Sequence, residues 1–429
     1  MRDFLPADKA RRERVLRRII DGYTKRGFRQ VETPVMEEAS RLHAGLGGDN
    51  EKLAFGVLRR GLTGEDLSKA AESGDVMSLM DLGLRYDLTV PLARFYASHR
   101  AELPGVFRAI QAAPVWRAER PQAGRYRQFM QCDIDIIGEP GILAEAELVT
   151  ATLGALADLG LTGVTVRIND RRLLTAMLNH FGFAEDVHAA VLITVDKLDK
   201  IGPDGVLAEL RERGHDEAAV AALGAFLIRP QTLEFRPFGE GQIRKGLPDG
   251  VEHEAIADLV QIGEAVAAGL GTDSADISGV PLVFDPFLVR GMGYYTGAIF
   301  ELAHPTAGFS LGGGGRYDGM IGRFLGTDVP AVGFSIGFER IIDLVELGAD
   351  AEPAVALLYD KAVSPVTLLR LQREFVEAGR PVVLMAAPKK VASALDRLAA
   401  DGVGEFSFVR DDAATAATLD LRPLAARDS

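Results

Sequence analysis

The residues best suited to chemistry stand in an arginine-rich turn between a Pro-Val-Trp segment and a strand-like segment. Four arginines occur within eleven residues of a chain whose net charge is −13, namely Arg117, Arg120, Arg125 and Arg127. A guanidinium group keeps its charge at every physiological pH, and its planar fork matches the oxygens of phosphate. The turn therefore favours a site for a small, highly charged anion. A solvated hairpin tip with paired charges is the alternative.

A carboxylate and a hydroxyl two residues apart form a second candidate site. Asp87 and Thr89 would share one face of the chain if this segment is a strand. Such a pair can hold an ammonium group by charge and by hydrogen bonding. A surface ion pair between Asp87 and Arg85 is the alternative reading of this segment.

A polar strand face follows the arginine turn directly. Alternate residues of this segment are polar and would point the same way, namely Gln131, Asp133 and Asp135. Ile134 and Ile136 would point into the core. A polar strand face is usually solvated, but its position after the turn favours the floor of a ligand site.

Three glycine-containing segments complete the set of candidate residues. The first combines Arg290 with Tyr294 and Tyr295, whose rings and hydroxyls suit a planar polar ligand. Segments 311–319 and 332–340 are interpreted as glycine-rich turns beside strands, where a missing side chain permits close approach to a ligand. Neither segment contains the Gly-Lys-Ser/Thr of a P-loop. Bulged strands with packed aromatic rings are the alternative.

The composition limits the classes of protein. A length of 429 residues indicates two or three domains. The single cysteine, Cys132, excludes an internal disulfide framework and a cysteine-based zinc site, and the sequence predicts no metal ligands. No signal-peptide core and no apolar run of membrane-spanning length is present, so we expect a cytoplasmic protein without a membrane partner. The acidic balance argues against broad, nonspecific nucleic-acid binding.

The order of elements indicates a mixed architecture. The sequence predicts a helix over 8–26, a strand over 28–35 interrupted by Pro34, a loop-like polar segment over 64–75 and a helix over 144–159. A mostly helical stretch from about 167 to 276 suggests an inserted subdomain. Strands are expected again at 282–284, 298–302 and 309–311, followed by a long helix from Phe338.

The last part of the chain alternates strands and helices. After a linker at 349–353, strands are predicted at 355–359, 381–385 and 406–409. Ser364 and Pro365 are typical of the N-cap and first position of a helix. This pattern predicts a small α/β domain with a largely parallel sheet.

Together these segments resemble the class II aminoacyl-tRNA synthetases and, within them, the histidyl-tRNA synthetase family. Segments 31–34, 117–129 and 333–340 are similar to class II motifs 1, 2 and 3. Segments 290–295 and 314–318 resemble the two signatures of the histidyl family. Segment 196–200 is similar to part of that family's inserted subdomain.

The resemblance implies an α+β fold. A class II catalytic domain with an antiparallel sheet and helices would cover residues 1–348, with an inserted helical subdomain at about 170–278. A small anticodon-binding-like α/β domain would cover 354–429. A homodimer is implied through the region of Pro34.

The resemblance also implies roles toward ATP. Arg117 and Arg290 would be the catalytic residues beside the α-phosphate, and Arg340 would hold the γ-phosphate. Glu119 and Arg125 would complete the ATP site, with Glu119 at the adenine end. Mg²⁺ would bridge the phosphates.

Histidine would be bound by seven residues. Asp87, Thr89 and Gln131 would receive its amino group. Its ring would be held by the remaining four residues, Asp135, Tyr294, Tyr295 and Tyr317. The carboxylate of histidine would attack the α-phosphorus to give histidyl-adenylate, and the histidyl group would pass to tRNA-His.

Two departures from the family pattern leave alternatives open. Gly293 stands where the signature usually carries aspartate, and the C-terminal domain is eroded, with Lys389-Lys390 as its only basic pair. One alternative is a histidine-adenylating paralog with a non-tRNA acceptor. The other is a non-catalytic histidine-sensing regulatory subunit of ATP phosphoribosyltransferase, against which Arg117, Arg340 and the C-terminal domain argue.

Overall fold

The computed structural model describes residues 2–43, 53–120, 126–228, 238–273, 275–289, 294–346, 354–410, 413 and 415–424. Contacts divide the chain into two compact units. One unit contains Leu16–Val345, and the other contains Arg2–Val15 and Glu346–Ser429. Within the described ranges, no helix is both long enough and apolar enough to cross a membrane.

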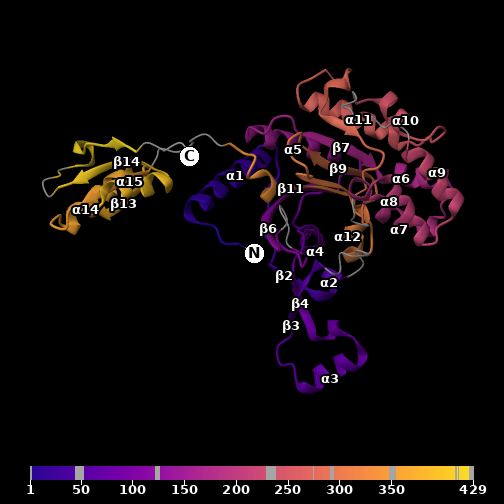
Figure 1. Ribbon diagram of the computed structural model, residues 1–429, viewed down its shortest axis with the longest axis horizontal. Coiled ribbons are helices and arrows are strands. Elements are labelled where there is room, and N and C mark those ends of the chain that lie inside the picture. Colours follow the sequence, from indigo (N-terminus) through magenta and orange to yellow (C-terminus); the bar gives the residue numbers. More distant parts are fainter. Residues whose placement is uncertain are drawn as a thin grey trace. The chain divides into compact units, whose positions relative to one another are not determined.

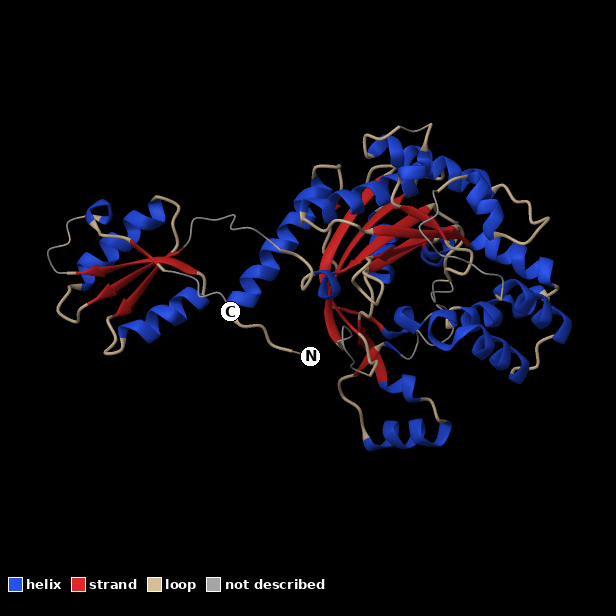
Figure 2. Ribbon diagram, turned by 45° about the horizontal axis from the view of Figure 1, so that its top comes forward, coloured by secondary structure: helices blue, strands red, loops and turns tan. Residues whose placement is uncertain are grey.

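An eight-stranded sheet forms the centre of the larger unit (Figure 2). Its strands, in spatial order, are β1 (Arg29–Gln30), β5 (Phe107–Trp116), β6 (Gln128–Ile137), β11 (Ala331–Gly337), β10 (Gly312–Arg316), β9 (Ala298–Ala303), β7 (Thr165–Asp170) and β8 (Leu282–Phe284). Every pair from β5 to β7 is antiparallel, and β1 and β8 add parallel edges. The predicted α+β class with an antiparallel sheet is therefore confirmed.

Helices cover both faces of this sheet (Figure 1). On one face, α5 (Leu143–Asp158) packs on β6 and β11, and α11 (Ala255–Gly269) packs on α5 and β7. On the other face, α4 (Thr89–His99) and α12 (Asp318–Leu325) pack on each other. Their buried side chains share one hydrophobic core with Ile137 of β6. The helix predicted at 144–159 is confirmed within one residue at each end.

The N-terminal helix α1 (Pro6–Thr24) has the predicted apolar stripe. Val15, Ile19 and Tyr23 are fully buried, and Gly27 has the positive φ of +85° that suits the residue after a helix. The predicted strand over 28–35 is reduced to β1, one of the two edge strands of the sheet. Pro34 lies between β1 and β2 (Met36–Glu38) and belongs to neither.

The predicted helical insertion follows β7. Its described helices are α6 (Arg171–Phe181), α7 (His188–Val195), α8 (Leu198–Glu212), α9 (Glu217–Leu227), α10 (Glu240–Gly246) and α11. Asp170 caps α6 because its carboxylate accepts a hydrogen bond from the backbone N–H of Arg172 at 2.8 Å. The chain returns to the large sheet through β8.

A three-stranded sheet carries an arm that projects from the larger unit (Figure 1). It consists of β2, β4 (Met80–Leu84) and β3 (Phe55–Leu58), and α2 (Ala39–His43) packs against it. The loop predicted at 64–75 is wrong, because α3 (Gly64–Ser73) occupies it. Thr63 and Asp66 form a capping box, and Gly74 ends the helix with φ +70°.

Predictions about the glycine-rich segments were also partly wrong. Gly312–Arg316 and Ala331–Gly337 are strands β10 and β11 rather than turns beside strands. Segment 309–311 is not a strand. The helix that begins at Phe338 is short, since α13 ends at Ile341.

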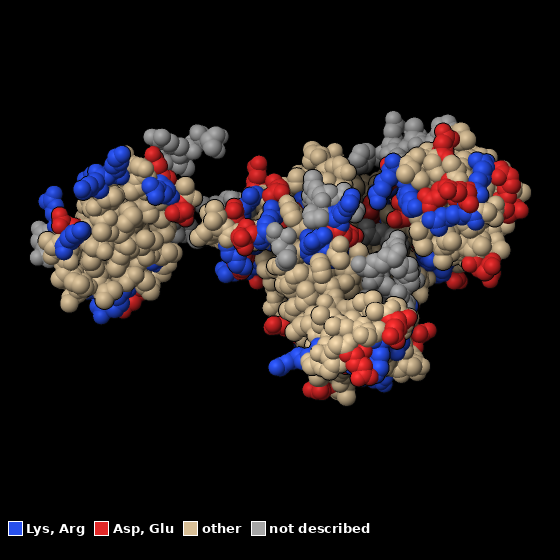
Figure 3. Space-filling view, turned by 60° about the horizontal axis from the view of Figure 1, so that its bottom comes forward, with Lys and Arg blue, Asp and Glu red and all other residues tan. Residues whose placement is uncertain are grey.

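The C-terminal unit contains the predicted α/β pattern. Its sheet has the order β13 (Val382–Ala386), β12 (Ala354–Tyr359), β14 (Val403–Val409) and β15 (Arg422–Pro423), and only β15 is antiparallel to its neighbour. Ser364 caps α14 (Pro365–Glu377) by accepting from the N–H of Thr367, as predicted. The second helix is α15 (Val391–Ala400). On the face visible in Figure 3, Lys and Arg form small separate groups beside a broad uncharged surface.

Candidate active site

One cavity of about 250 Å³ brings the predicted site residues together on the α4 side of the large sheet. Ten of them line it: Asp87, Thr89, Arg117, Glu119, Gln131, Asp135, Tyr294, Tyr295, Tyr317 and Arg340. The other two, Arg125 and Arg290, lie outside the described residues. Segments more than 200 residues apart in the sequence therefore meet in one site.

Asp87 lies at the junction between β4 and α4. The prediction that Asp87 and Thr89 share a strand was wrong, because β4 ends at Leu84 and α4 begins at Thr89. One oxygen of Asp87 accepts a hydrogen bond from the backbone N–H of Val90 at 3.2 Å, in the first turn of the helix. The turn that leads into α4, instead of strand alternation, thus brings both side chains to the cavity.

The second oxygen of Asp87, Oδ2, is buried and has no hydrogen-bond partner among the described residues. Burial raises the pKa of Asp87 to about 6, against a lowering by the N–H of Val90 and the charge of Arg117. A surface ion pair with Arg85 does not exist, because Arg85 is buried and donates to the carbonyls of Thr33 and Pro114.

The floor of the cavity is the polar face of β6, as the alternation predicted. Gln131, Asp133 and Asp135 are all buried. Opposite them on β11 stand Gly337, Ser335 and Gly333. The side-chain amide oxygen of Gln131, Oε1, is a second buried acceptor without a partner in the described part of the chain.

An aromatic group encloses one end of the cavity. The hydroxyl of Tyr317 donates to Asp135 at 2.6 Å. The ring of Tyr294 lies edge-on to Tyr317 with centroids 6.1 Å apart, and Tyr295 lies 4.7 Å from Tyr294. Burial raises the pKa of Asp135 to about 7, although the Tyr317 hydrogen bond lowers it.

The aromatic end of the cavity depends on Gly333, which lies opposite Asp135. A Cβ atom on Gly333 would lie 2.2 Å from a carboxylate oxygen of Asp135 and 3.1 Å from the ring of Tyr317. A Cβ on Gly314 would lie 1.9 Å from the carbonyl oxygen of Gly333. The glycines therefore allow close approach of protein groups to each other, as well as forming the wall of the cavity.

Fixed arginines mark the other end. Arg117 donates from Nε to the carbonyl of Tyr86 at 3.0 Å and lies over the ring of Phe129 at 5.1 Å. Its backbone N–H donates to the carbonyl of Arg127 at 2.8 Å, one residue beyond the paired ends of β5 and β6. Arg340 donates to the carbonyl of Ser310 and lies 5.9 Å from the ring of Phe309. Both guanidinium groups are thus oriented before any anion binds.

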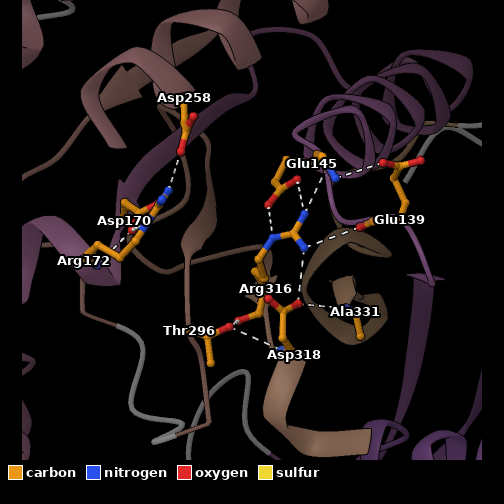
Figure 4. Close-up of polar contacts among 10 residues, drawn as sticks. Glu139, Glu145, Asp170, Arg172, Asp258, Thr296, Arg316, Asp318 and Ala331 are labelled. Carbon is orange, nitrogen blue, oxygen red and sulfur yellow. Dashed lines mark hydrogen bonds and ion pairs between the residues drawn. The ribbon is translucent and has the colours of Figure 1, made fainter. Parts of the chain in front are cut away.

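Arg316, next to Tyr317 in the second signature segment, does not line this cavity and points toward Glu145 (Figure 4). It forms a two-bond ion pair with the buried Glu145 of α5, at 2.6 and 2.8 Å, and a longer one with Asp318 at 3.2 Å. Asp318 in turn accepts from the N–H of Ala331 at 2.9 Å. This network holds the strand end that carries Tyr317.

Several lining residues were not among the predicted ligand contacts. They are Tyr126, Phe129, Ser335 and Glu339, besides glycines and Phe334. Asp133 also lines the cavity, as the alternation with Gln131 and Asp135 predicted. Ser335 carries no local signal, because only the register of β11 against β6 places it opposite Asp133.

The arrangement separates two kinds of binding. Buried carboxylates and unpartnered acceptors suit a ligand that brings N–H donors, and the arginines suit a polyanion. A group held between them would react under fixed charges of the protein, as transition-state stabilisation requires.

Comparisons with known proteins agree with this geometry. The family model for histidyl-tRNA synthetase matches residues 1–341. The histidine--tRNA ligase of Leifsonia xyli subsp. xyli is 58% identical over 428 residues, covering 99% of this chain and 97% of that protein. The probable histidine--tRNA ligase of Tropheryma whipplei is 41% identical over 416 residues, covering 95% and 94%.

Two solved structures share the fold. A histidyl-tRNA synthetase from Nostoc sp. PCC 7120 has a TM-score of 0.74 at 24% identity, covering 99% of this chain and 93% of that one. An ATP phosphoribosyltransferase regulatory subunit/histidyl-tRNA synthetase from Bacillus halodurans C has a TM-score of 0.74 at 20% identity, covering 95% and 96%. With a family model over 341 residues and a relative 58% identical along nearly the whole length, this chain belongs to the histidyl-tRNA synthetase family.

Proposed function

We propose that this protein is a histidine–tRNA ligase that activates histidine with ATP and transfers the histidyl group to tRNA-His. One observation carries the assignment of the amino-acid site. Asp87 Oδ2 and the side-chain oxygen Oε1 of Gln131 are buried acceptors without partners in the described structure, and both residues line the cavity. An ammonium group brings three N–H donors and a positive charge, so it satisfies both acceptors at once. Thr89 supplies a hydroxyl beside them.

The aromatic end suits an imidazole ring. Asp135 has one oxygen engaged by Tyr317 and can accept a ring N–H with the other. Tyr294 and Tyr295 supply ring faces and edges of the right size. A ligand without a ring N–H would leave a buried carboxylate unpaired, and such a loss discriminates strongly between ligands.

The arginine end suits the phosphates of ATP. The proposal gives Arg117 and Arg290 to the α-phosphate, Arg340 to the γ-phosphate, and Glu119 and Arg125 to the rest of the nucleotide. The carboxylate oxygen of histidine forms a bond to the α-phosphorus, and the bond from that phosphorus to the bridging oxygen breaks. Pyrophosphate leaves, so no protein nucleophile is needed. A hydroxyl of tRNA then attacks the carbonyl carbon, and AMP leaves.

The proposal includes Mg²⁺ as a companion of the nucleotide. No described group of three or more Asp, Glu, His or Cys residues could hold a metal by itself. Mg²⁺ is usually held by one or two carboxylates together with substrate phosphates. Glu339 fits this role, because it lines the cavity on the same segment as Arg340. The ion would offset phosphate charge.

The two alternatives receive less support. The relatives that align along nearly the whole chain are histidine–tRNA ligases, which does not favour a non-tRNA acceptor. A histidine sensor without catalysis would have no use for two pre-oriented arginines in the same cavity as the ammonium site.

The wider assignments follow from this function. Residues 1–348 would form the catalytic domain, with the insertion at about 170–278, and 354–429 would read the anticodon. A homodimer through the region of Pro34 would cover Val35, Met36 and Leu58, which are 42%, 46% and 60% exposed in the single chain. Since the reaction consumes ATP and tRNA, the proposal places it in the cytoplasm.

The test is histidine-dependent exchange between ATP and pyrophosphate, followed by addition of purified tRNA-His. Arg117→Ala and Arg290→Ala should abolish exchange. Exchange followed by charging is the expected result. Exchange without charging would shift the assignment to an adenylating enzyme with another acceptor, and absence of exchange in the unaltered protein would promote the sensor.

A further inference from the structure

We infer that Asp133 and Ser335 are positioning residues that fix the orientation of the Gln131 side-chain amide, and thereby set selectivity for ligands with an α-ammonium group. The inference rests on the proposed function and adds two residues and a mechanism to it. It starts from three buried or half-buried polar groups: Gln131 and Asp133 on one face of β6, and Ser335 of β11 directly opposite Asp133.

The hydrogen bonds run in one direction. The amide nitrogen of Gln131 donates to the hydroxyl of Ser335 at 3.0 Å. That hydroxyl donates to a carboxylate oxygen of Asp133 at 2.5 Å. The same amide nitrogen lies 3.4 and 3.5 Å from the two carboxylate oxygens. The hydroxyl of Ser335 has a single proton, which points to Asp133 in this hydrogen bond, so the hydroxyl can only accept from Gln131.

The reverse orientation of the amide would therefore be unfavourable. Its carbonyl oxygen would face the carboxylate of Asp133 and a hydroxyl whose proton is already donated. Its nitrogen would face the cavity, where the ammonium group of a ligand also brings only donors. The network thus leaves the carbonyl oxygen of Gln131 as the buried atom without a described partner.

A bound ammonium group reinforces this orientation. Burial and the charge of Asp135 raise the pKa of Asp133 in the empty cavity. A positive charge at Asp87 and Gln131 favours the ionised form of Asp133, which has no proton to donate and can only accept, as it does from Ser335. Ligand and network therefore stabilise each other. A ligand without the ammonium group does not favour the ionised form of Asp133 and is not stabilised by the network.

The experiment compares two ligands in two variants. Ser335→Ala and Asp133→Asn each free the amide to rotate. Histidine binding and the inhibition of exchange by 3-(imidazol-4-yl)propionate, which lacks the amino group, are measured for each protein. We expect the histidine Kd to rise on the order of tenfold or more, as for loss of a hydrogen bond to a charged group. The propionate should bind within about twofold of its unaltered affinity, since it never contacts Gln131 through an ammonium.

Ser407→Ala is the matched control, because Ser407 is a buried serine on strand β14 of the other unit. It should change neither affinity. Equal losses for both ligands in Ser335→Ala and Asp133→Asn would show general damage to the cavity and overturn the inference, as would unchanged histidine affinity in both variants. If the unaltered protein binds no histidine, the proposed function itself fails, which is a separate outcome.

Discussion

At the scale of single residues, the cavity depends on carboxyl groups in surroundings that disfavour their charge. Asp87, Asp133 and Asp135 are 5% exposed or less, and the pKa of each is raised by burial. Raised carboxyl pKa values in a cleft often mark a functional site. Here they indicate that the ligand must supply the missing positive charge and N–H donors.

Histidine binding should weaken as the pH falls through about 6. Below the pKa of Asp87, which is about 6, the carboxyl group must lose a proton before it can pair with the ammonium. Affinity should then fall by up to about tenfold per pH unit. Calorimetric titration at pH 7.5 and 5.5 tests this. The ring of 1,2,4-triazolylalanine stays neutral in this range, so this analogue separates Asp87 from titration of the ligand.

Asp87→Asn serves as the control for this prediction. It should bind weakly at both pH values and lose the part of the pH dependence that comes from Asp87, while the part from Asp135, whose pKa is about 7, remains. If Asp87→Asn keeps the full pH dependence of binding, a group other than Asp87 causes it.

Asp135→Asn should stabilise the ligand-free protein, and more so at high pH. The carboxyl pKa rises from 3.8 to about 7 on folding, so the folded state holds a proton that the unfolded state releases. The unfavourable contribution is absent below about pH 4, grows as the pH rises, and is complete above about 7. Asparagine removes it and can still accept from Tyr317. Thermal unfolding at pH 5 and 8 measures the difference, and a larger gain at pH 5 would contradict the argument.

At the scale of elements, the sequence pattern predicted some placements and missed others for physical reasons. The alternation of polar residues along 131–135 was enough to predict which side chains face the cavity, because β6 is a regular strand on which side chains alternate. It failed at Asp87 because this residue hydrogen-bonds the first turn of α4. Four successive glycines carry no alternation at all, so only pairing with β9 and β11 reveals β10 as a strand.

Long-range register was the part that local pattern could not supply. Gly333 opposes Asp135, and Ser335 opposes Asp133, across about 200 residues of sequence. The helix α3 was missed for a different reason. Its polar residues resemble a loop, and the capping box of Thr63 and Asp66 compensates for them.

Gly333→Ala should raise the histidine KM while the ATP KM changes little. The added methyl group would overlap Asp135 and press on Tyr317, at the end of the cavity away from the arginines. Overpacking costs roughly 1–3 kcal/mol, which corresponds to a change of about fivefold or more in KM. Steady-state exchange assays with each substrate varied provide the measurement.

Gly241→Ala in α10 is the matched control, because an added Cβ there has no atom within 4 Å. Both KM values should stay unchanged. A parallel rise of both KM values in Gly333→Ala would point to global distortion of the sheet instead of a local overlap.

At the scale of the whole molecule, two compact units divide the work that the proposal assigns. The larger unit holds every described residue of the cavity. The smaller unit has its own hydrophobic clusters on both sides of a mainly parallel sheet. The strand–helix order of this unit could be predicted from sequence, because its caps and apolar strands are local features.

The proposed homodimer should dissociate when its apolar surface is charged. Met36→Asp combined with Leu58→Asp places two carboxylates among side chains that are exposed in the single chain. Folding should therefore survive, while a dimer interface of standard size would lose apolar burial at its centre. Sedimentation velocity should show the unaltered protein as a dimer and the variant as a monomer.

Ile228→Asp is the control, since Ile228 is 69% exposed on the inserted subdomain. It should leave the dimer intact. A monomeric unaltered protein would refute the homodimer proposal, and an intact dimer in the double variant would move the interface elsewhere.

Because the cavity contains three buried aspartates, the ammonium group of bound histidine also acts as a counterion of the protein. An occupied cavity exchanges unsatisfied acceptors for paired ones, so free histidine should shift the folding equilibrium as its concentration exceeds the Kd. Marginal stability links such shifts to the amount of protein that survives proteolysis. A cell short of histidine would then hold less of this protein, and the supply of the substrate would set the abundance of its consumer.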